Sequence, residues 1–188
     1  ILIGDFHEMV DFNPGSSTYN LSAKGFYDLF ILKLDAGGNF TWAKRVGAML
    51  KGEKSTTAAS IASDASGNLY LTGKFEDEVD FDPGSAMHLE KSYGSFDIFV
   101  LKLSSNGNFV WVNKMGGEQY DFGSAISVDS TGNVILGGVF AGGAYFNPAS
   151  VKYDAVSQGA YDGFVCMLSV TGVFRKLIQI GGITDDDV

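Results

Sequence analysis

The chain has 188 residues, of which 45% are hydrophobic and only 19% are charged, and its formal net charge is −9. This length suffices for one domain with a hydrophobic core, and the negative charge argues against a nucleic-acid partner, which needs clustered Lys and Arg. No apolar run reaches membrane-spanning length, so membrane insertion is not expected. The single cysteine, Cys166, excludes an internal disulfide.

The first segments of the chain are strand-like and are separated by turns. ILIGDF (1–6) is followed by the turn phrase DFNPG (11–15), and then by YDLFILKL (27–34) and GNFTWAK (38–44). Proline, glycine and aspartate suit turns because proline fixes φ, glycine supplies positive φ and aspartate bonds its own backbone. No segment has a helical period of apolar residues.

The middle of the chain contains four strand-like segments. SIASD (60–64) and NLYLTGKF (68–75) are joined by a hairpin turn, and DFDPG (80–84) follows them. FDIFVLKL (96–103) and GNFVWVN (107–113) complete the set. Because strands such as IFVLKL are apolar on both faces, both faces of the sheet are expected to be covered.

The last third of the chain repeats this order with AISVD (125–129), NVILGGVF (133–140), YFNPA (145–149) and YDGFVCML (161–168). Equivalent turns begin at Asp11, Asp80 and Tyr145, which are 69 and 65 residues apart. Four extra residues therefore lie in a longer loop in the range 47–60. Self-similarity at a fixed period indicates that one structural unit was copied three times.

We predict an all-β fold of three tandem four-stranded antiparallel blades of a β-propeller, within a single partial propeller covering 1–188. The blade units are 1–47, 58–117 and 123–182, and the first is incomplete because its innermost strand is missing. Separate domains along the chain are the competing architecture. Three blades do not close a ring, so we expect part of a larger ring, completed by further repeats of a longer chain or by other copies.

The phrases FDIFVLKL, NFVW, ISVD and DFDPG together resemble the SBBP-type bacterial β-propeller repeat, and the resemblance covers essentially the whole chain. The third copy departs from it: Lys176 stands where Trp42 and Trp111 stand, and Tyr145 replaces an aspartate. The resemblance implies a propeller in an exported or cell-surface bacterial protein. It implies no reaction, because propellers host many unrelated functions.

Repeated aspartates are the first candidates for chemistry: Asp11, Asp80 and Asp82 in the proline turns, and Asp28, Asp97 and Asp162 at strand starts. Calcium needs six to eight oxygen ligands, and two acids in a turn leave most of that shell unfilled. We therefore interpret these aspartates as acceptors of backbone N–H groups, and predict no metal site and no cofactor.

The remaining candidates also favour structural roles. Acidic residues Asp185 to Asp187 are interpreted as a solvated loop, and Cys166 as a buried hydrophobe. Trp111 is expected to be largely buried between blades, like Phe99 and Phe109, and Trp42 occupies the same repeat position. His7 and His88 have no partner at metal-ligand or triad spacing.

Two classes of function remain open. The first is a non-catalytic propeller segment of a secreted or cell-surface bacterial protein that acts as a scaffold, adhesion module or ligand-binding platform. The alternative is a carbohydrate-active propeller enzyme of the glycoside hydrolase or lyase type, which needs paired carboxylates near the central axis. Only Asp64 and Asp129 lie near that axis, and both sit in repeated hairpins. We therefore favour the non-catalytic class, with no catalytic residue, and with a glycan or protein ligand as the possible partner.

Overall fold

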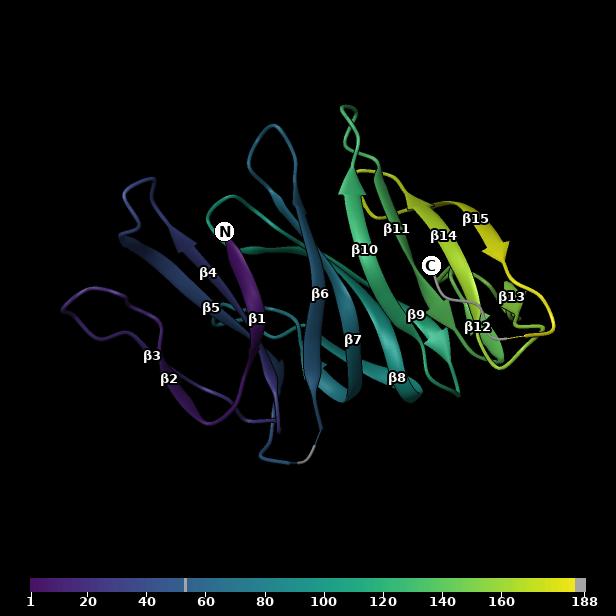
Figure 1. Ribbon diagram of the computed structural model, residues 1–188, viewed down its shortest axis with the longest axis horizontal. Coiled ribbons are helices and arrows are strands. Elements are labelled where there is room, and N and C mark those ends of the chain that lie inside the picture. Colours follow the sequence, from purple (N-terminus) through teal and green to yellow (C-terminus); the bar gives the residue numbers. More distant parts are fainter. Residues whose placement is uncertain (53, 185–188) are drawn as a thin grey trace.

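The computed structural model describes residues 1–52 and 54–184, which form strands joined by turns and loops. The strands are β1 (Leu2–Phe6), β2 (Met9–Asp11), β3 (Asn20–Ser22), β4 (Asp28–Leu34), β5 (Phe40–Ala48), β6 (Thr56–Ser63), β7 (Leu69–Asp80), β8 (Leu89–Leu103), β9 (Phe109–Gly117), β10 (Phe122–Val128), β11 (Val134–Phe140), β12 (Gly143–Tyr145), β13 (Ala155–Val156), β14 (Asp162–Leu168) and β15 (Phe174–Ile180). Figure 1 shows the strands spread along the molecule, with β2 and β3 at one end, β6 and β7 in the middle, and β13 and β15 at the other end.

Three antiparallel units make up the fold. The first unit pairs β1 with β4 and β4 with β5, the second pairs β6 to β9 in order, and the third pairs β10, β11, β14 and β15. The first unit has three strands of this set where the others have four. The predicted fold class is therefore confirmed: all-β blades, the first incomplete, in an array that is not closed (Figure 1).

Hairpin turns inside the units follow the chemistry of their sequences. Gly67 and Gly107 adopt φ angles of +76° and +75°, which side-chain-bearing residues avoid. The preceding residues Asp64 and Ser104 accept the backbone N–H of these glycines through their carbonyl oxygens. These turns connect β6 to β7 and β8 to β9, as the sequence predicts.

The phrases around the prolines form a structure that the sequence reading treated only as connections. In each unit the second strand is interrupted at a residue with positive φ, namely Glu8, Asp77 or Gly142, and then continues into a short antiparallel hairpin. We call this hairpin the arm; the three arms are β2 with β3, Glu78–Asp80 with Leu89–Lys91, and β12 with β13.

Each arm of the second and third units reaches back to the preceding unit. Ala48 at the end of β5 pairs with Val79, and Gly117 at the end of β9 pairs with Ala144. These backbone ladders join the first two units and the arm of the third unit into one continuous path of strands. The arm is thus a clasp between consecutive blades.

Two layers of the hydrophobic core lie between the units, and a third, smaller cluster around Phe6, Phe12 and Ala43 belongs to the first unit. One layer joins Leu29 and Ile31 of the first unit to Phe99 and Leu101 of the second. The other joins Ile98 of the second unit to the third unit. Successive residues of a strand point to opposite faces, so β8 sends alternate side chains into both layers. The expectation that both faces of the middle sheet are covered is confirmed.

Candidate functional site

Buried polar side chains gather where consecutive units meet. Asp28, Asp97 and Asp162 occupy equivalent places at the start of the third main strand of each unit, and all three are fully buried. The last residues of the same unit's fourth strand and the residues that begin the next unit's innermost strand lie beside Asp28 and Asp97. We call this place the junction, first between units one and two, second between units two and three.

At the first junction the buried carboxylate is fully satisfied. Asp28 accepts the backbone N–H groups of Lys24 at 2.8 Å and of Ala48 at 3.2 Å, and it forms an ion pair with Arg45. A buried charge requires such pairing, since an isolated carboxylate is costly to remove from water. Asp28 is therefore a structural fastener between β4 and the end of β5.

In the third unit a neutral donor replaces the arginine. Asp162 accepts a hydrogen bond from Gln179 Nε2 at 2.6 Å, and another from the Gln158 N–H at 3.2 Å. Gln179 stands at the repeat position of Arg45. The carboxylate again ties the start of its strand to the neighbouring strand β15.

The second junction holds two buried carboxyl groups. Asp97 Oδ2 accepts the Tyr93 N–H at 2.8 Å, but Asp97 Oδ1 has no hydrogen-bond partner among the described residues. Asp121 Oδ2 and Oδ1 accept the N–H groups of Gly117 at 2.7 Å and of Ala141 at 3.1 Å. Burial raises the pKa of Asp97 to about 7, with a contribution from the Asp121 charge, and burial raises the pKa of Asp121 to about 6.

The turn aspartates act as backbone acceptors, in accord with their sequence interpretation. Asp11 Oδ1 accepts the N–H groups of Asn13 and Tyr19 at 3.0 and 2.9 Å. Asp80 Oδ1 accepts those of Asp82 and His88 at the same two distances. Each carboxylate therefore closes its proline turn from inside the arm.

In the third arm, where Tyr145 replaces the acid, the sequence analysis missed a substitute. Asp154 lies across the hairpin, and its Oδ2 accepts the N–H groups of Phe146 at 2.8 Å and Asn147 at 2.7 Å. The sequence does contain a signal: an aspartate follows the proline phrase in the third arm, but not in the first or second. The same backbone demand is met from the opposite strand.

Asp64 and Asp129 cap the hairpins between the two innermost strands. Hydrogen bonds from Asn133 and Thr131 lower the pKa of Asp129 to about 2. Burial raises the pKa of Asp64, but hydrogen bonds from Asn68 and Tyr70 outweigh it and leave the pKa below its usual value. A general acid needs a raised pKa, so neither carboxyl group suits that role.

No group of three or more His, Cys, Asp or Glu able to hold a metal ion occurs within 1–52 and 54–184. We therefore expect EDTA to change the thermal unfolding midpoint by no more than about 1 °C, because a ligand that is not bound adds no stability by mass action. Differential scanning calorimetry with and without EDTA checks this. A fall of many degrees that added calcium, and not magnesium, restores would contradict it.

The tryptophans link the fourth strand of one unit to a hairpin turn of the next. The Trp42 ring lies against Gly107, and the Trp111 ring lies against Gly172, with Trp111 Nε1 donating to the Val170 carbonyl at 3.3 Å. The expected position between blades is confirmed. Phe99 is fully buried, while Trp111 and Phe109 are intermediate and pack against the two core clusters. Trp111 is therefore buried less completely than Phe99.

Trp111→Ala should lower the free energy of unfolding by about 2 kcal/mol, less than the loss for a fully buried aromatic ring. The cost comes from lost contact with the next unit's turn. Urea unfolding followed by circular dichroism measures it. Trp111→Phe keeps a ring but loses the Nε1 donor, so its free energy of unfolding should lie between those of the wild type and Trp111→Ala. An alanine variant as stable as the wild type would show that the ring does not join the units.

The remaining candidates have no catalytic setting. Cys166 is buried in β14, and burial raises the pKa of its thiol to about 12, so it is a hydrophobic core residue as predicted. His7 Nδ1 lies 2.5 Å from the Phe26 carbonyl, and His88 stacks on Phe109. The acidic residues 185–187 lie outside the described residues.

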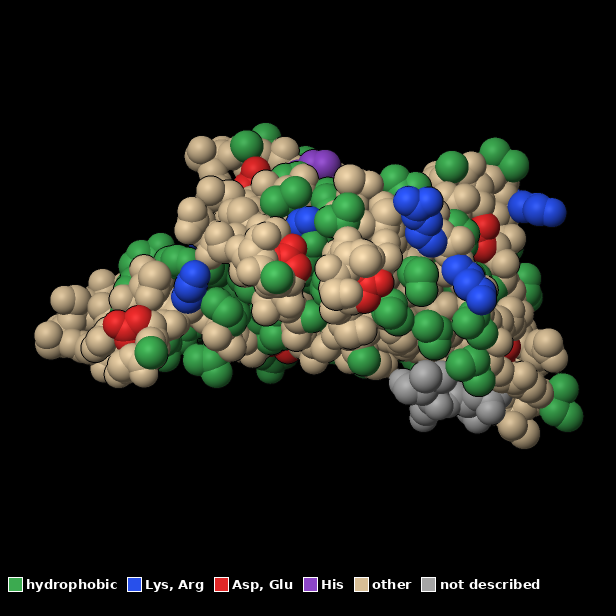
Figure 2. Space-filling model, turned by 90° about the horizontal axis from the view of Figure 1, so that it is seen from above, with side chains coloured by type: hydrophobic (Ala, Val, Ile, Leu, Met, Phe, Trp, Pro, Cys, Tyr) green, Lys and Arg blue, Asp and Glu red, His purple; other side chains and the backbone are tan. Residues whose placement is uncertain are grey.

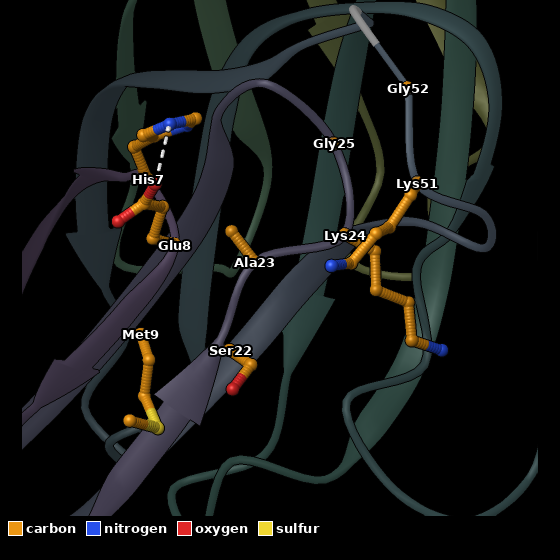
Figure 3. A pocket seen from close by; sticks show the side chains of 9 residues that line it. All are labelled: His7, Glu8, Met9, Ser22, Ala23, Lys24, Gly25, Lys51 and Gly52. Carbon is orange, nitrogen blue, oxygen red and sulfur yellow. Dashed lines mark ion pairs between the residues drawn. The ribbon is translucent and has the colours of Figure 1, made fainter.

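A shallow depression of about 470 Å³ opens beside the first arm. Figure 3 shows His7, Glu8 and Met9 on one side of it and Lys24, Gly25 and Lys51 on the other. His7 Nε2 lies 3.7 Å from Glu8 Oε1. Charges of both signs line the depression without converging on one point, so its chemistry specifies no reaction.

The face drawn in Figure 2 carries charged side chains scattered among hydrophobic and uncharged ones. No extended basic patch crosses this face, which agrees with the net charge of −9. No helix long and apolar enough to cross a membrane occurs among the described residues.

Comparison with known proteins agrees with this architecture. No family model matches the chain. It is similar to an uncharacterized WD repeat-containing protein of Acanthamoeba polyphaga mimivirus, with 25% identity over 92% of this chain and 14% of that protein. The chain is a repeat protein of the β-propeller type. It is also similar to the regulatory protein FlaEY of Caulobacter vibrioides, with 24% identity over 79% of this chain and 15% of that protein. The chain thus spans about one seventh of the length of these relatives.

Proposed function

We propose that the chain is a non-catalytic β-propeller segment of a secreted or cell-surface bacterial protein, where it serves as a scaffold or as an adhesion or ligand-binding platform. The observation that carries this proposal is the use of the repeated acids. Those of the turns and hairpins bind backbone N–H groups of their own repeat, those of the junctions bind backbone N–H groups of the same or the adjoining repeat, and the pair with raised pKa values is buried without solvent access. Polar side chains that are engaged in this way stabilise the fold and are not free to act on a substrate.

The partners that fit this frame are further repeat units, from the same longer chain or from other copies. Val10 and Asp11 in β2 occupy the positions of Val79 and Asp80, which pair with the preceding unit. The molecule itself makes this contact twice, between the end of β5 and the second arm and between the end of β9 and the third arm. A further repeat unit would make the same contact with the first arm.

The depression beside the first arm supports the same proposal. Its counterpart in the second unit, around Asp77 and Lys91, is lined on the other side by the linker residues Met49 to Gly52 of the first unit. The linker of a preceding unit would occupy the depression near Glu8 in the same manner. We therefore interpret the depression as part of a contact surface for the linker of another unit, and not as a substrate pocket.

Secretion and the bacterial cell surface enter the proposal through the resemblance to the SBBP-type repeat, whose copies occur in large exported proteins. Antibodies raised against residues 1–188 should label intact cells that express the natural protein. Labelling only after permeabilisation would overturn the proposed localisation while leaving the scaffold role in place.

The enzyme alternative is tested with a glycan panel that records both binding and cleavage. Whether or not a glycan binds, we expect no cleavage product. The reason is that no accessible carboxyl pair with separated pKa values is present among the described residues. Product release that scales with protein concentration would overturn the non-catalytic proposal. Asp129→Asn is the matched variant, because it should leave any binding unchanged if Asp129 only caps its hairpin.

A further inference from the structure

Asp97 and Asp121 both approach Gly116 in the second junction. The position that a Cβ atom on Gly116 would occupy lies 2.7 Å from Asp121 Oδ2 and 2.8 Å from Asp97 Oδ1. Both side chains are fully buried. Two carboxyl groups in a common buried site repel each other strongly when both are ionised, because water does not screen their charges.

The donors around this pair are too few for two ionised groups. Three backbone N–H groups serve Asp97 Oδ2 and both oxygens of Asp121, and none reaches Asp97 Oδ1. At the first junction Arg45 supplies a positive charge to Asp28, and Thr56 stands at the repeat position of Asp121. The second junction therefore has one acid more and one paired cation fewer.

The cation at the position of Arg45 is turned toward other groups. Lys114 Nζ lies 3.9 Å from the centre of the Tyr93 ring, 3.8 Å from Glu90 Oε2, and within hydrogen-bond distance of the Lys91 carbonyl. These groups on β8 and β9 are the charged and titratable neighbours on the Asp97 side. On the Asp121 side, β9 and the residue after β11 contribute only backbone N–H groups.

We propose that Asp97 and Asp121 share one proton, which Asp97 Oδ1 donates to Asp121 Oδ2, and that loss of this proton as the pH rises to neutrality loosens the second junction. The proton comes from solvent and returns to it, so the step needs no other reactant. When bound, this proton gives Asp97 Oδ1 the hydrogen bond that it otherwise lacks, and it removes one of the two buried charges. Asp121 keeps both N–H bonds, which tie β9 to the third unit.

The direction of the pH effect follows from linkage. The folded pKa of Asp97, about 7, lies above the ordinary value of 3.8, so between about pH 4 and pH 7 the folded state binds more protons than the unfolded state. The free energy of unfolding therefore falls as the pH rises through this window. Below pH 4 the contribution is complete, and above pH 7 the destabilisation is complete.

The experiment compares thermal unfolding midpoints between pH 5 and pH 8.5 for the wild type, Asp97→Asn and the control Asp28→Asn. In Asp97→Asn the amide donates permanently to Asp121, so this variant should lose most of the pH dependence and melt roughly 5 °C above the wild type at pH 8. Asp28→Asn removes the charge that Arg45 needs, so it should melt below the wild type and keep the wild-type slope. Carboxyl carbon NMR should show the pair titrating in two separated steps.

Three results would overturn the proposal. The first is a wild-type midpoint that does not fall between pH 5 and pH 8, and the second is an Asp97→Asn variant with the wild-type slope. The third is a rise of the wild-type midpoint on adding calcium at pH 8 that Asp97→Asn abolishes, because it would identify a bound cation in place of the proton. An Asp97→Asn variant that does not fold would also count against it, since the amide reproduces the protonated form.

Discussion

Phe99→Ala is expected to lower the free energy of unfolding by roughly 3 to 5 kcal/mol, the largest loss among the substitutions considered. Phe99 is fully buried in the layer between the first and second units, where its ring lies 5.3 Å from that of Phe81. Truncation leaves a cavity that two sheets with fixed hydrogen-bond registers cannot collapse to fill. Urea unfolding followed by circular dichroism measures the loss.

Val110→Ala is the matched control, since Val110 is a neighbouring strand residue whose side chain is exposed. Its expected change lies within about 0.5 kcal/mol. Equal losses for the two variants would mean that the layer between the units is not the stabilising core, and the stacking of the blades would then need revision.

Gly73→Ala should cost about 3 kcal/mol, at the upper end of what overpacking usually costs. A Cβ atom at this position would lie 2.0 Å from the Thr57 carbonyl oxygen and 2.9 Å from the Ala58 Cα. The obstacle is backbone, so no side chain can rotate away. The strand β6 bulges between Ala58 and Ser60, which brings its backbone over Gly73.

Gly138 repeats this arrangement against the Phe122 carbonyl, again at 2.0 Å, so Gly138→Ala should cost a similar amount. Gly52→Ala is the control, because nothing lies within 4 Å of the added Cβ atom. Thermal unfolding compares the three variants. If Gly73→Ala had the same unfolding midpoint as Gly52→Ala, the close approach of the β6 bulge to Gly73 would not exist in solution.

The strands of each unit and their order were predictable because their signals are local. Alternating and continuous apolar runs marked the strands, and glycine with aspartate marked the hairpins, as at Asp64 and Gly67. The stacking of units was also predictable, since IFVLKL in β8 is apolar on both faces and a single sheet would expose one of them. Local patterns repeated at a fixed period carry this much of the fold.

The arms were not predictable from such patterns. Their contact with the preceding unit consists of two residue pairs between segments far apart in sequence, such as Ala48 with Val79. No periodicity extends over so short a ladder, and the prolines drew attention to the turn instead of to the strand before it. Asp77, the residue at positive φ that begins the arm, is not a glycine and gave no turn signal.

The carboxyl pair was missed for a different reason. Asp97 has the same repeat position as Asp28 and Asp162, so the sequence assigned all three one role. The difference lies in their neighbours: Lys114 stands in place of Arg45, and Asp121 in place of Thr56. Comparing the repeats at these two positions would have shown that the second junction has one acid more than the first. It would not have shown that Asp97 Oδ1 lacks a hydrogen-bond donor.

The account depends most directly on consecutive units being clasped as blades by the arms, and a disulfide tests this contact. Ala48 and Val79 are directly opposed in an antiparallel ladder, where Cα atoms lie about 4.5 to 5.5 Å apart, within the range that a disulfide spans. The variant carrying Ala48→Cys and Val79→Cys should form an intramolecular bond on mild oxidation and keep the circular dichroism of the wild type. Ala48→Cys with Val110→Cys should form none, because Ala48 and Val110 are not opposed in any ladder. Failure of the folded first variant to cross-link, or cross-links only between molecules, would contradict the blade arrangement and favour separate units along the chain.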